Sequence, residues 1–457
     1  MFFRQYFLGC LSHASYLVGD ETTGRAVVVD PQRDIDAYLA DADEAGLTIE
    51  KVIETHFHAD FLSGHLELAA KTGAEICYGE AADADFPITH LRDGDTVPLG
   101  DVALEIRTTP GHTPESISVI VREHAGDDVP YGVLTGDTLF IGDVGRPDLL
   151  SSEGVTADEL ARQLYHSLRG KLMTLPDDTR VFPAHGAGSA CGKNLSTETS
   201  STIGEQRRTN YALKPMSEEA FVQVVTEGQP TTPLYFSFDA HRNREAHALL
   251  DEHAPPPALE LDEVMARRAA GAVVVDTRQH PEFAAGHLAG SLNVGLEGRF
   301  AEYAGDVLRP DDEIVLVCDP GHALEAKVRL ARIGFDNVTG FLADPVRAFL
   351  DRPDLVVRSS RLTADELAER LRTIRDVAIV DVRNPGEAAE GMITGAINIP
   401  VARLLDRIGE LDPARPTVVY CAGGYRSSIA ASSLVAGGFD DVSDVLGGYE
   451  GWRNRHQ

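Results

Sequence analysis

The sequence predicts an α/β protein built as one layered N-terminal domain and two smaller domains with parallel sheets. The first observation is that short, β-branched apolar runs alternate with segments of helical periodicity along most of the chain. The second is an internal repeat, because Asp276 and Asp381 are 105 positions apart (381 − 276), as are Asn293 and Asn398 (398 − 293). A stiff Ala254–Pro257 segment precedes the repeat and predicts a linker. The predicted domains are 1–253, 258–352 and 360–457.

Length and composition narrow the function. At roughly 150 residues per domain, 457 residues fit three domains. The formal net charge is -31, so nucleic acid and anionic membranes are not expected partners. The five cysteines are scattered and form no Cys-x-x-Cys pair, which predicts a reducing compartment. The N-terminus lacks the pattern of a signal peptide, and no apolar stretch reaches the ~18 residues of a membrane span, so we expect a cytoplasmic enzyme.

In the N-terminal domain, apolar runs predict strands separated by turns and helices. The strands are expected at residues 2–18, 25–30, 49–55, 102–109, 117–122 and 132–135, and the apolar pair 181–182 leads into the His185 loop. The helices are expected at residues 34–44, 61–71 and 156–168. Asp34 should cap the first helix, and Thr156 with Glu159 has the spacing of a capping box at the third. Residues 205–253 are polar with a helical pattern, and we expect them to form a cover.

The loop after the 49–55 strand carries two histidines and a carboxylate, in the order His56, His58 and Asp60. Loops at strand ends are where α/β folds place their chemistry, and neutral imidazole with carboxylate suits Zn or Fe. A single His-x-His pair is weak support, since most such pairs bind no metal. The support increases because three later turns also follow apolar runs and carry one candidate ligand each. These candidates are His112, Asp137 and His185.

These segments, in this order, resemble the metallo-β-lactamase superfamily, which implies an αββα sandwich for the N-terminal domain. The first motif of that family is His-x-His-x-Asp-His, and its last position is Phe61 in this sequence. Phe61 cannot ligate a metal, so a two-metal hydrolase site is disfavoured. For a two-metal site, the resemblance implies that His56, His58 and His112 hold the first metal. Asp60 and His185 would hold the second metal, and Asp137 would bridge the two.

A single metal remains compatible with the pattern, because His56, His112 and Asp137 form the two-His-one-carboxylate set that leaves positions open on Fe(II). That set is typical of persulfide dioxygenases, the mononuclear-iron branch that this sequence resembles. The resemblance implies one Fe(II) per chain, a low-molecular-weight thiol persulfide and O2 as substrates, sulfite as product, and homo-oligomers. It also implies that Arg146 lines the substrate pocket. The residues left to orient the metal ligands are His58, Asp60 and His185.

Both repeats resemble rhodanese-type sulfurtransferase domains in an Asp-x-Arg strand end, a Gly-x-x-x-Gly-x-x-Asn segment and a cysteine loop after an apolar strand. In the second repeat, Cys421 opens a tight loop, and a helix is expected from Ser428. Converging N–H groups, the helix N-terminus and the Arg426 cation should lower the thiol pKa and hold a persulfide anion. The other residues expected to bind substrate are Gly423, Gly424, Tyr425 and Ser427.

The first repeat carries Cys318 in a loop that departs from this pattern. Aligned on the cysteine, Ala323 stands in the place of Arg426. The loop also contains Asp319, which repels an anion, and Pro320, which lacks an N–H donor. We therefore expect Cys318 to be poorly activated and this domain to be a degenerate, structural one, although a nearby histidine could supply part of the missing charge.

The sequence thus favours a persulfide dioxygenase followed by a degenerate and then an active rhodanese domain. Sulfite from the first site would accept sulfur from Cys421 to give thiosulfate, and tethering the two sites raises the effective concentration of sulfite. Two other interpretations stay open. One is a dinuclear zinc thioester hydrolase of the glyoxalase II kind, which needs a second metal. The other is a non-dioxygenase sulfur-relay protein that acts through the rhodanese domain.

Overall fold

The computed structural model describes residues 1–149 and 154–455 and divides into two compact units. Unit 1 consists of Met1–Pro230 and Phe236–Leu250, and unit 2 of Thr231–Tyr235 and Asp251–Gln457. Among the helices of the described residues, none is both long and apolar enough to cross a membrane.

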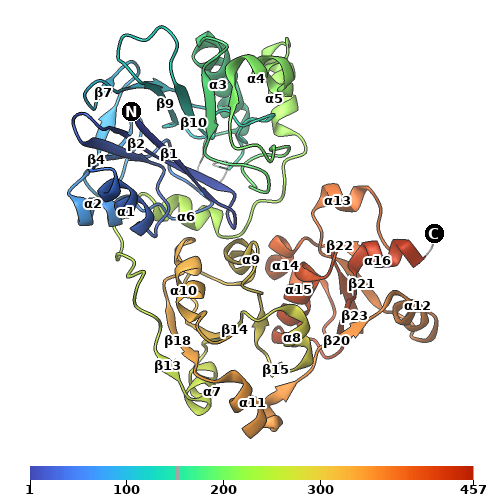
Figure 1. The fold of residues 1–457 in the computed structure, drawn as a ribbon. Helices are drawn as coiled ribbons and strands as arrows, with labels where there is room; N and C mark the ends of the chain where they lie inside the picture. Colours follow the sequence, from blue (N-terminus) through green and yellow to red (C-terminus); the bar gives the residue numbers. More distant parts are fainter. Residues whose placement is uncertain (150–153, 456–457) are drawn as a thin grey trace. The chain divides into compact units, whose positions relative to one another are not determined.

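Unit 1 contains two six-stranded sheets with helices packed on their outer faces (Figure 1). The first sheet has the order β1 (Phe2–Leu8), β2 (His13–Asp20), β3 (Arg25–Val29), β4 (Thr48–Ile53), β5 (Glu75–Gly79), β6 (Thr89–Leu91). The second has the order β12 (Ser201–Thr202), β11 (Arg180–Pro183), β10 (Gly132–Gly136), β9 (Ile117–Arg122), β8 (Ala103–Thr108), β7 (Thr96–Pro98). The helices are α1 (Asp36–Glu44) and α2 (His65–Thr72) on the first sheet, then α3 (Ala157–Gly170), α4 (Ile203–Thr209) and α5 (Glu218–Thr226) on the second, and α6 (Phe236–Arg242). This is the predicted αββα sandwich.

Both faces of each sheet are buried, which explains why the strands appear in the sequence as continuous apolar runs. In β2, Tyr16 packs into the core between the sheets, while Leu17 packs under α1 and α2. In β9, Val119 faces the core between the sheets, and Ile120 packs with α3 on the outside. Successive side chains thus alternate between two apolar layers.

Some local expectations are confirmed and others are wrong. Strand β9 has the expected bounds, and α3 begins with a capping box in which Thr156 and Glu159 bond reciprocally. The single strand expected over 2–18 is instead two antiparallel strands, β1 and β2, paired from Phe2 with Gly19. A short turn joins them, and neighbouring strands with so short a connection can pair only antiparallel.

Two helix starts also differ from expectation. Helix α1 starts after Ile35, and the carboxylate of Asp34 accepts a bond from Gln32 Nε2 (3.2 Å) outside the helix. Helix α2 starts at His65, four positions later than expected. The reason is that Ser63 N–H donates to a distant side chain (2.9 Å), which holds the preceding loop in a non-helical path.

Unit 2 contains two five-stranded sheets with the same strand order and all-parallel pairing (Figure 1). The first has β13 (Ala258–Leu259), β18 (Val338–Leu342), β17 (Ile314–Val317), β14 (Val273–Asp276), β16 (Leu292–Asn293). The second has β20 (Ser360–Leu362), β24 (Val442–Val445), β23 (Thr417–Tyr420), β21 (Ala378–Asp381), β22 (Ile397–Asn398). The main helices are α7 (Leu261–Ala269), α8 (His280–Ala285), α9 (Phe300–Val307), α10 (Ala323–Ala331), α11 (Pro345–Asp351), α12 (Ala364–Thr373), α13 (Pro385–Ala389), α14 (Val401–Arg407), α15 (Tyr425–Ala436) and α16 (Gly448–Arg455).

Residues 353–359, which lie between the predicted ranges 258–352 and 360–457 and are therefore expected to link the two domains, form part of the first of them. Residues of β19 (Val356–Val357) pair antiparallel with β15 (His287–Leu288) in a small separate sheet. A short 3-10 turn, Pro353–Leu355, precedes this strand. The connection is therefore tied to the first domain by backbone hydrogen bonds.

Candidate functional site

Three candidate ligands converge at the ends of strands from both sheets of unit 1. His56 lies beyond β4, His112 beyond β8 and Asp137 beyond β10. Asp137 Oδ2 lies 3.4 Å from His112 Nε2 and 3.9 Å from His56 Nε2. All three side chains are buried, and their ligand atoms lie within 4.8 Å of one another. The fold therefore brings together the set predicted to hold one metal.

Hydrogen bonds fix the tautomers of both histidines. His112 Nδ1 lies 2.8 Å from the carbonyl oxygen of Arg146, which can only accept, so Nδ1 carries the proton. Thr55 Oγ1 donates to Asp30 (2.9 Å) and therefore accepts from His56 Nδ1 (3.0 Å). Each imidazole thus presents the lone pair of Nε2 to Asp137, which is the form that binds a metal.

The donor set fits a cation. Within the described residues, His56 Nε2 and both carboxylate oxygens of Asp137 are buried without a hydrogen-bond partner. Burial raises the pKa of Asp137 to about 6 and lowers the pKa of His112 to about 4. Both shifts reflect the cost of charge in a dry site, and a bound cation would offset that cost.

The residues expected to orient the ligands lie beside this cluster. His58 Nε2 lies 3.1 Å from Asp30 Oδ1 and 3.4 Å from Glu54 Oε2. Burial acts to lower the pKa of His58, but these two carboxylates outweigh it and the pKa is raised well above its usual value. His185 Nε2 lies 3.3 Å from Asp60 Oδ2. Asp60, the carboxylate of the first histidine motif, thus pairs with His185.

Phe61 occupies the position beside these residues that a sixth-position histidine would take. Its ring centroid lies 3.9 Å from that of His13 and 4.3 Å from that of His58. The phenyl ring is buried, so it fills this space without offering a ligand. On the other side, the Cys191 thiol lies within 4.8 Å of the ligand atoms of Asp137 and His185. Burial, then Asp60 and Asp137, raise the pKa of Cys191 well above its usual value.

Sequence reasoning missed Asn243, which follows α6 in the segment expected to be only a cover. Its Nδ2 donates to the carbonyl oxygens of His58 and Phe61 (2.8 Å each), and its Oδ1 accepts from Ser63 N–H (2.9 Å). Asn243 is fully buried and so ties the histidine loop to the end of unit 1. Its signal in the sequence is weak, because one asparagine in a polar segment has no periodicity.

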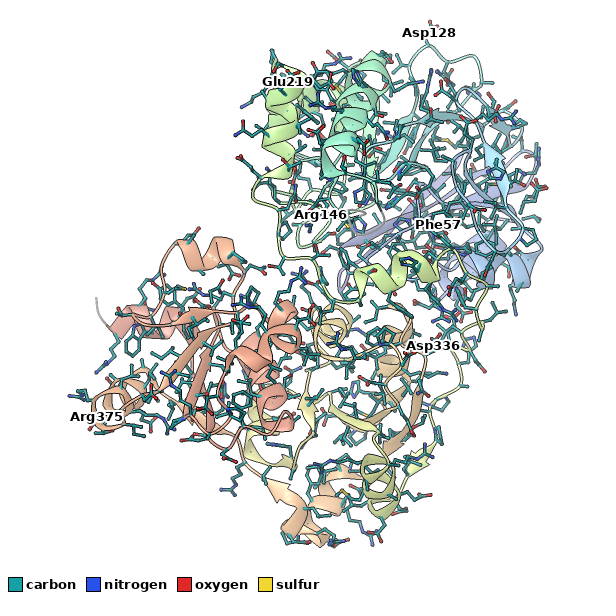
Figure 2. The ribbon with its side chains drawn as sticks, turned by 180° about the vertical axis from the view of Figure 1, so that it is seen from behind. Phe57, Asp128, Arg146, Glu219, Asp336 and Arg375 are labelled. Atoms are coloured by element: carbon teal, nitrogen blue, oxygen red, sulfur yellow. The ribbon has the colours of Figure 1, made fainter. Side chains whose placement is uncertain are left out.

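Arg146 is buried near the metal cluster, and Figure 2 shows it in the same half of unit 1 as Phe57, away from Asp128 and Glu219. Its guanidinium forms a two-bond pair with Asp148 (2.7 and 2.8 Å) and donates to the carbonyl oxygen of Ala190 (3.1 Å). Its own carbonyl is the acceptor for His112. Arg146 therefore connects the metal ligand to the Cys191-containing loop.

We call the loop from Cys421 to Ser427 the sulfur cradle, because one of its backbone N–H groups points at the cysteine sulfur. Gly424, with φ of 121°, points its N–H at Cys421 Sγ (3.0 Å). A side chain is strained in this left-handed region, which explains the glycine. The thiol of Cys421 lies 3.6 Å from Ser427 Oγ. Helix α15 begins at Tyr425, not at Ser428 as expected, because Gly424 already turns the chain and serves as the N-cap.

The other loop side chains are engaged with neighbours. Arg426 forms a two-bond ion pair with Glu387 (2.7 and 2.8 Å), so its charge is partly balanced. The hydroxyl of Tyr425 donates to the carbonyl oxygen of Gly295 (2.7 Å) in the first rhodanese-like domain. Among the described residues other than its chain neighbours, Gly423 has nothing within 4 Å of where a Cβ would stand. The loop therefore has an open side.

The Cys318 loop differs from the Cys421 loop because carboxylates surround its thiol. The thiol is buried, and burial, then Asp276 and Asp319, raise its pKa to about 12. At neutral pH a thiol with this pKa stays protonated and is a poor nucleophile.

Comparisons with known proteins agree with these observations. Residues 8–185 match the family described as the Metallo-beta-lactamase superfamily, and residues 260–344 and 363–455 match the Rhodanese-like domain. The human protein "Persulfide dioxygenase ETHE1, mitochondrial" is 32% identical over 226 residues, 49% of this chain and 79% of the human protein. A "Probable metallo-hydrolase" of Burkholderia pseudomallei is 30% identical over 48% of this chain and 82% of its own length.

A solved structure extends further along the chain. The crystal structure of a metallo-beta-lactamase from Staphylococcus aureus is 35% identical, covers 74% of this chain and 98% of its own, and has a TM-score of 0.67. The sandwich in unit 1, the paired parallel domains in unit 2 and these matches lead to one assignment. The chain belongs to the metallo-beta-lactamase superfamily, with persulfide dioxygenase homologues for its N-terminal part, and continues into two rhodanese-like domains.

Proposed function

We propose that unit 1 oxidises low-molecular-weight thiol persulfides with O2 to sulfite at one Fe(II), and that the last domain transfers sulfane sulfur to sulfite to give thiosulfate. Homology to persulfide dioxygenases and to rhodanese-like domains supports a role in sulfur metabolism. The reaction products of the two sites are chemically complementary. Sulfite made in unit 1 is the acceptor that the Cys421 site needs, and one chain holds both sites at high effective concentration.

In this proposal His56, His112 and Asp137 hold the ion through two Nε2 atoms and one carboxylate. When bound, Fe(II) would supply open positions for O2 and the persulfide, and the outer sulfur of the persulfide would supply the electrons that reduce O2. The chain contributes the fixed tautomers, because Thr55 and the Arg146 carbonyl keep both Nε2 lone pairs directed at the ion.

We assign the recognition of the persulfide anion to Arg146. Its guanidinium already pairs with Asp148, so an entering anion would compete for N–H donors that now serve the carboxylate. The same residue positions His112, so substrate recognition and ligand orientation meet at one side chain. His58, Asp60 and His185 would support the site without holding the ion.

Phe61 is the observation that carries the single-iron proposal. Its buried ring packs on His13 and His58 and offers no ligand where a second metal would need one. A dinuclear zinc hydrolase is the second candidate, and the likeness to the Burkholderia "Probable metallo-hydrolase" supports its hydrolytic part, since that name specifies no metal. The two candidates differ in metal content and in the bond that is broken.

The test is anaerobic purification followed by metal quantification and oxygen-electrode assays with glutathione persulfide and coenzyme A persulfide. We expect one Fe per chain, O2 consumption with at least one persulfide, and sulfite as product. Two Zn per chain with thioester cleavage would establish the hydrolase instead. Normal sulfite formation after His56→Ala, His112→Ala or Asp137→Ala would favour a sulfur-relay protein. Sedimentation of the same preparation tests the expected self-association.

A further inference from the structure

The helix that opens the Cys421 loop is anchored to the first rhodanese-like domain. Three hydroxyl groups of α15 do this, at positions 425, 428 and 432, which share one helix face. Tyr425 Oη donates to the Gly295 carbonyl (2.7 Å), and Ser428 Oγ donates to Asn293 Oδ1 (2.8 Å). Ser432 Oγ accepts from Asn293 N–H (2.9 Å). The first domain therefore fixes the position of the sulfur cradle.

Beside the cradle, Gly424 faces one nitrogen group from each domain. Gly424 donates its N–H to the Cys421 sulfur on one side. A methyl group placed on Gly424 would have, among the described residues beyond its chain neighbours, two atoms within 4 Å. They are Arg361 Nη2 at 3.7 Å, from β20, and His280 Nε2 at 3.8 Å, from the start of α8 in the first domain. We call the region between Gly424 and these two nitrogen atoms the acceptor opening.

Both groups have hydrogen-bonding capacity left for a ligand. Nε2 is the ring nitrogen of His280 that lies near Gly424, and the other ring nitrogen, Nδ1, is buried with no hydrogen-bond partner within the described residues. Burial, then the Arg361 cation, lowers the pKa of His280, so the neutral imidazole offers one N–H donor. Arg361 pairs with Asp444 through Nε (3.1 Å) and Nη2 (3.2 Å), which uses only part of its five N–H donors.

The charges around the opening are otherwise balanced. Arg361 faces Asp444 as its partner, and Arg426 on the loop faces Glu387. A small oxyanion entering the opening would therefore meet N–H donors without an unpaired carboxylate opposing it. This matters in a chain whose formal net charge is -31, because the surrounding field repels anions.

We propose that His280 and Arg361 form a binding site for the acceptor sulfite at the acceptor opening, so that the first rhodanese-like domain supplies part of the active site of the second. The proposal rests on the proposed sulfur transfer by Cys421 and adds the residues that recognise its acceptor. It assigns an active contribution to a domain whose own cysteine is poorly activated.

The chemical step places the acceptor beside the sulfur. The sulfite sulfur attacks the outer sulfur of the Cys421 persulfide, and a new S–S bond forms. The bond between Sγ and the outer sulfur breaks, and its electron pair stays on Sγ as the thiolate. Thiosulfate leaves, and no further oxidant or reductant is needed. The role of His280 and Arg361 is to hold the sulfite oxygens while its lone pair faces the persulfide.

The test uses the full chain, with Cys421 loaded by glutathione persulfide and thiosulfate formation followed over a sulfite titration. His280→Ala should raise the KM for sulfite about tenfold, the loss expected for one hydrogen bond to a charged acceptor. Transfer to the neutral acceptor dithiothreitol should change by less than about twofold, because it needs no oxyanion contact. Loading of Cys421, followed by mass spectrometry, and O2 consumption should match the unaltered chain.

Two further variants keep the test decisive. His280→Gln retains an amide donor and should recover part of the sulfite affinity, with thermal melting as the check of folding. His322→Ala, which removes an exposed histidine in the same domain, should leave the KM for sulfite unchanged. An unchanged sulfite KM in His280→Ala, or an equal loss with dithiothreitol, overturns the proposal while thiosulfate formation by the unaltered chain stands. If the unaltered chain sulfurates dithiothreitol but never sulfite, the proposed function fails and this site fails with it.

Discussion

The two rhodanese-like domains share one framework and differ at the loop that would carry the chemistry. In both, the arginine of Asp-x-Arg pairs with its aspartate, through bonds of 2.9 and 2.5 Å at Arg278 and of 2.9 and 2.6 Å at Arg383. In both, an asparagine Nδ2 donates to the carbonyl oxygen of that aspartate, at 3.0 Å for Asn293 and 2.9 Å for Asn398. The repeated motif residues thus support the sheet edge and do not mark activity.

The two domains differ in the cysteine loops that follow β17 and β23. The Cys421 sulfur accepts a hydrogen bond from the Gly424 N–H, and the same loop carries the Arg426 cation. The Cys318 sulfur is buried beside two carboxylates, Asp276 and Asp319. A duplicated domain can therefore keep its fold after losing an anion cradle, because the cradle contributes little to the core.

The largest expected effect is the loss of sulfur transfer on removing the Cys421 sulfur. Cys421→Ser should lower thiosulfate formation by at least about 1000-fold, since the nucleophile itself is lost. Cys318→Ser should change it by less than about twofold, because that thiol is protonated and buried. Thiosulfate quantification with glutathione persulfide and sulfite measures both. Loss of transfer in Cys318→Ser would break the distinction between the two domains.

The second-largest expected effect tests whether sulfur transfer at Cys421 depends on the metal site of unit 1. Asp137→Ala should lower O2 consumption about 100-fold or more, because one of three metal ligands is lost. Sulfur transfer from Cys421 to added sulfite should stay within about twofold of the unaltered chain. Chelation of the purified chain should reproduce the pattern, with added Fe(II) restoring O2 consumption only where Asp137 is present. A parallel fall in both activities would mean that the Cys421 site depends on the metal.

A smaller effect is expected from moving loop features between the domains. With a pKa of about 12, the Cys318 thiol stays protonated at pH 8 and should alkylate slowly, its rate rising only as the pH approaches that value. Replacing Asp319 with Ala, Pro320 with Gly and Ala323 with Arg should raise the alkylation rate at pH 8 about tenfold, because a repelling charge is exchanged for an attracting one. Peptide mass spectrometry distinguishes Cys318 from Cys421. An unchanged rate would show that burial alone silences Cys318.

The sequence predicted the parts of the molecule that depend on local pattern. Apolar runs located most strands of the sandwich, the constant 105-residue offset located the duplicated framework, and the strand-end residues His56, His112 and Asp137 lie together in the structure. These predictions succeed because the ends of strands in a layered fold meet at one edge. Residues that directly follow such strands therefore lie close together even when they are far apart in the sequence.

Contacts between segments distant along the chain could not be predicted. Asn243 holds a loop 180 positions earlier, Glu387 pairs with Arg426 across 39 positions, and His280 reaches the Cys421 loop from another domain. Neither Asn243 nor His280 belongs to a periodic run, and Glu387 belongs only to a capping box with Asn384, which does not indicate its partner Arg426. Their partners are set by packing of whole elements, which the local pattern does not encode.

The smallest expected effect concerns the Arg426 charge, the feature that most separates the two loops. Glu387 lies 2.7 and 2.8 Å from the guanidinium and balances part of its charge. Glu387→Gln keeps the shape but removes the negative charge, so the cation should act more strongly on the nearby sulfur. Alkylation of Cys421 at pH 6.5 should rise about threefold, and thiosulfate formation should change by a similar factor or less. Arg426→Ala in the same assay should move the rate the opposite way. If both variants slow alkylation, the pair acts by holding the loop in place, and the difference between the two domains would then lie in loop geometry more than in charge.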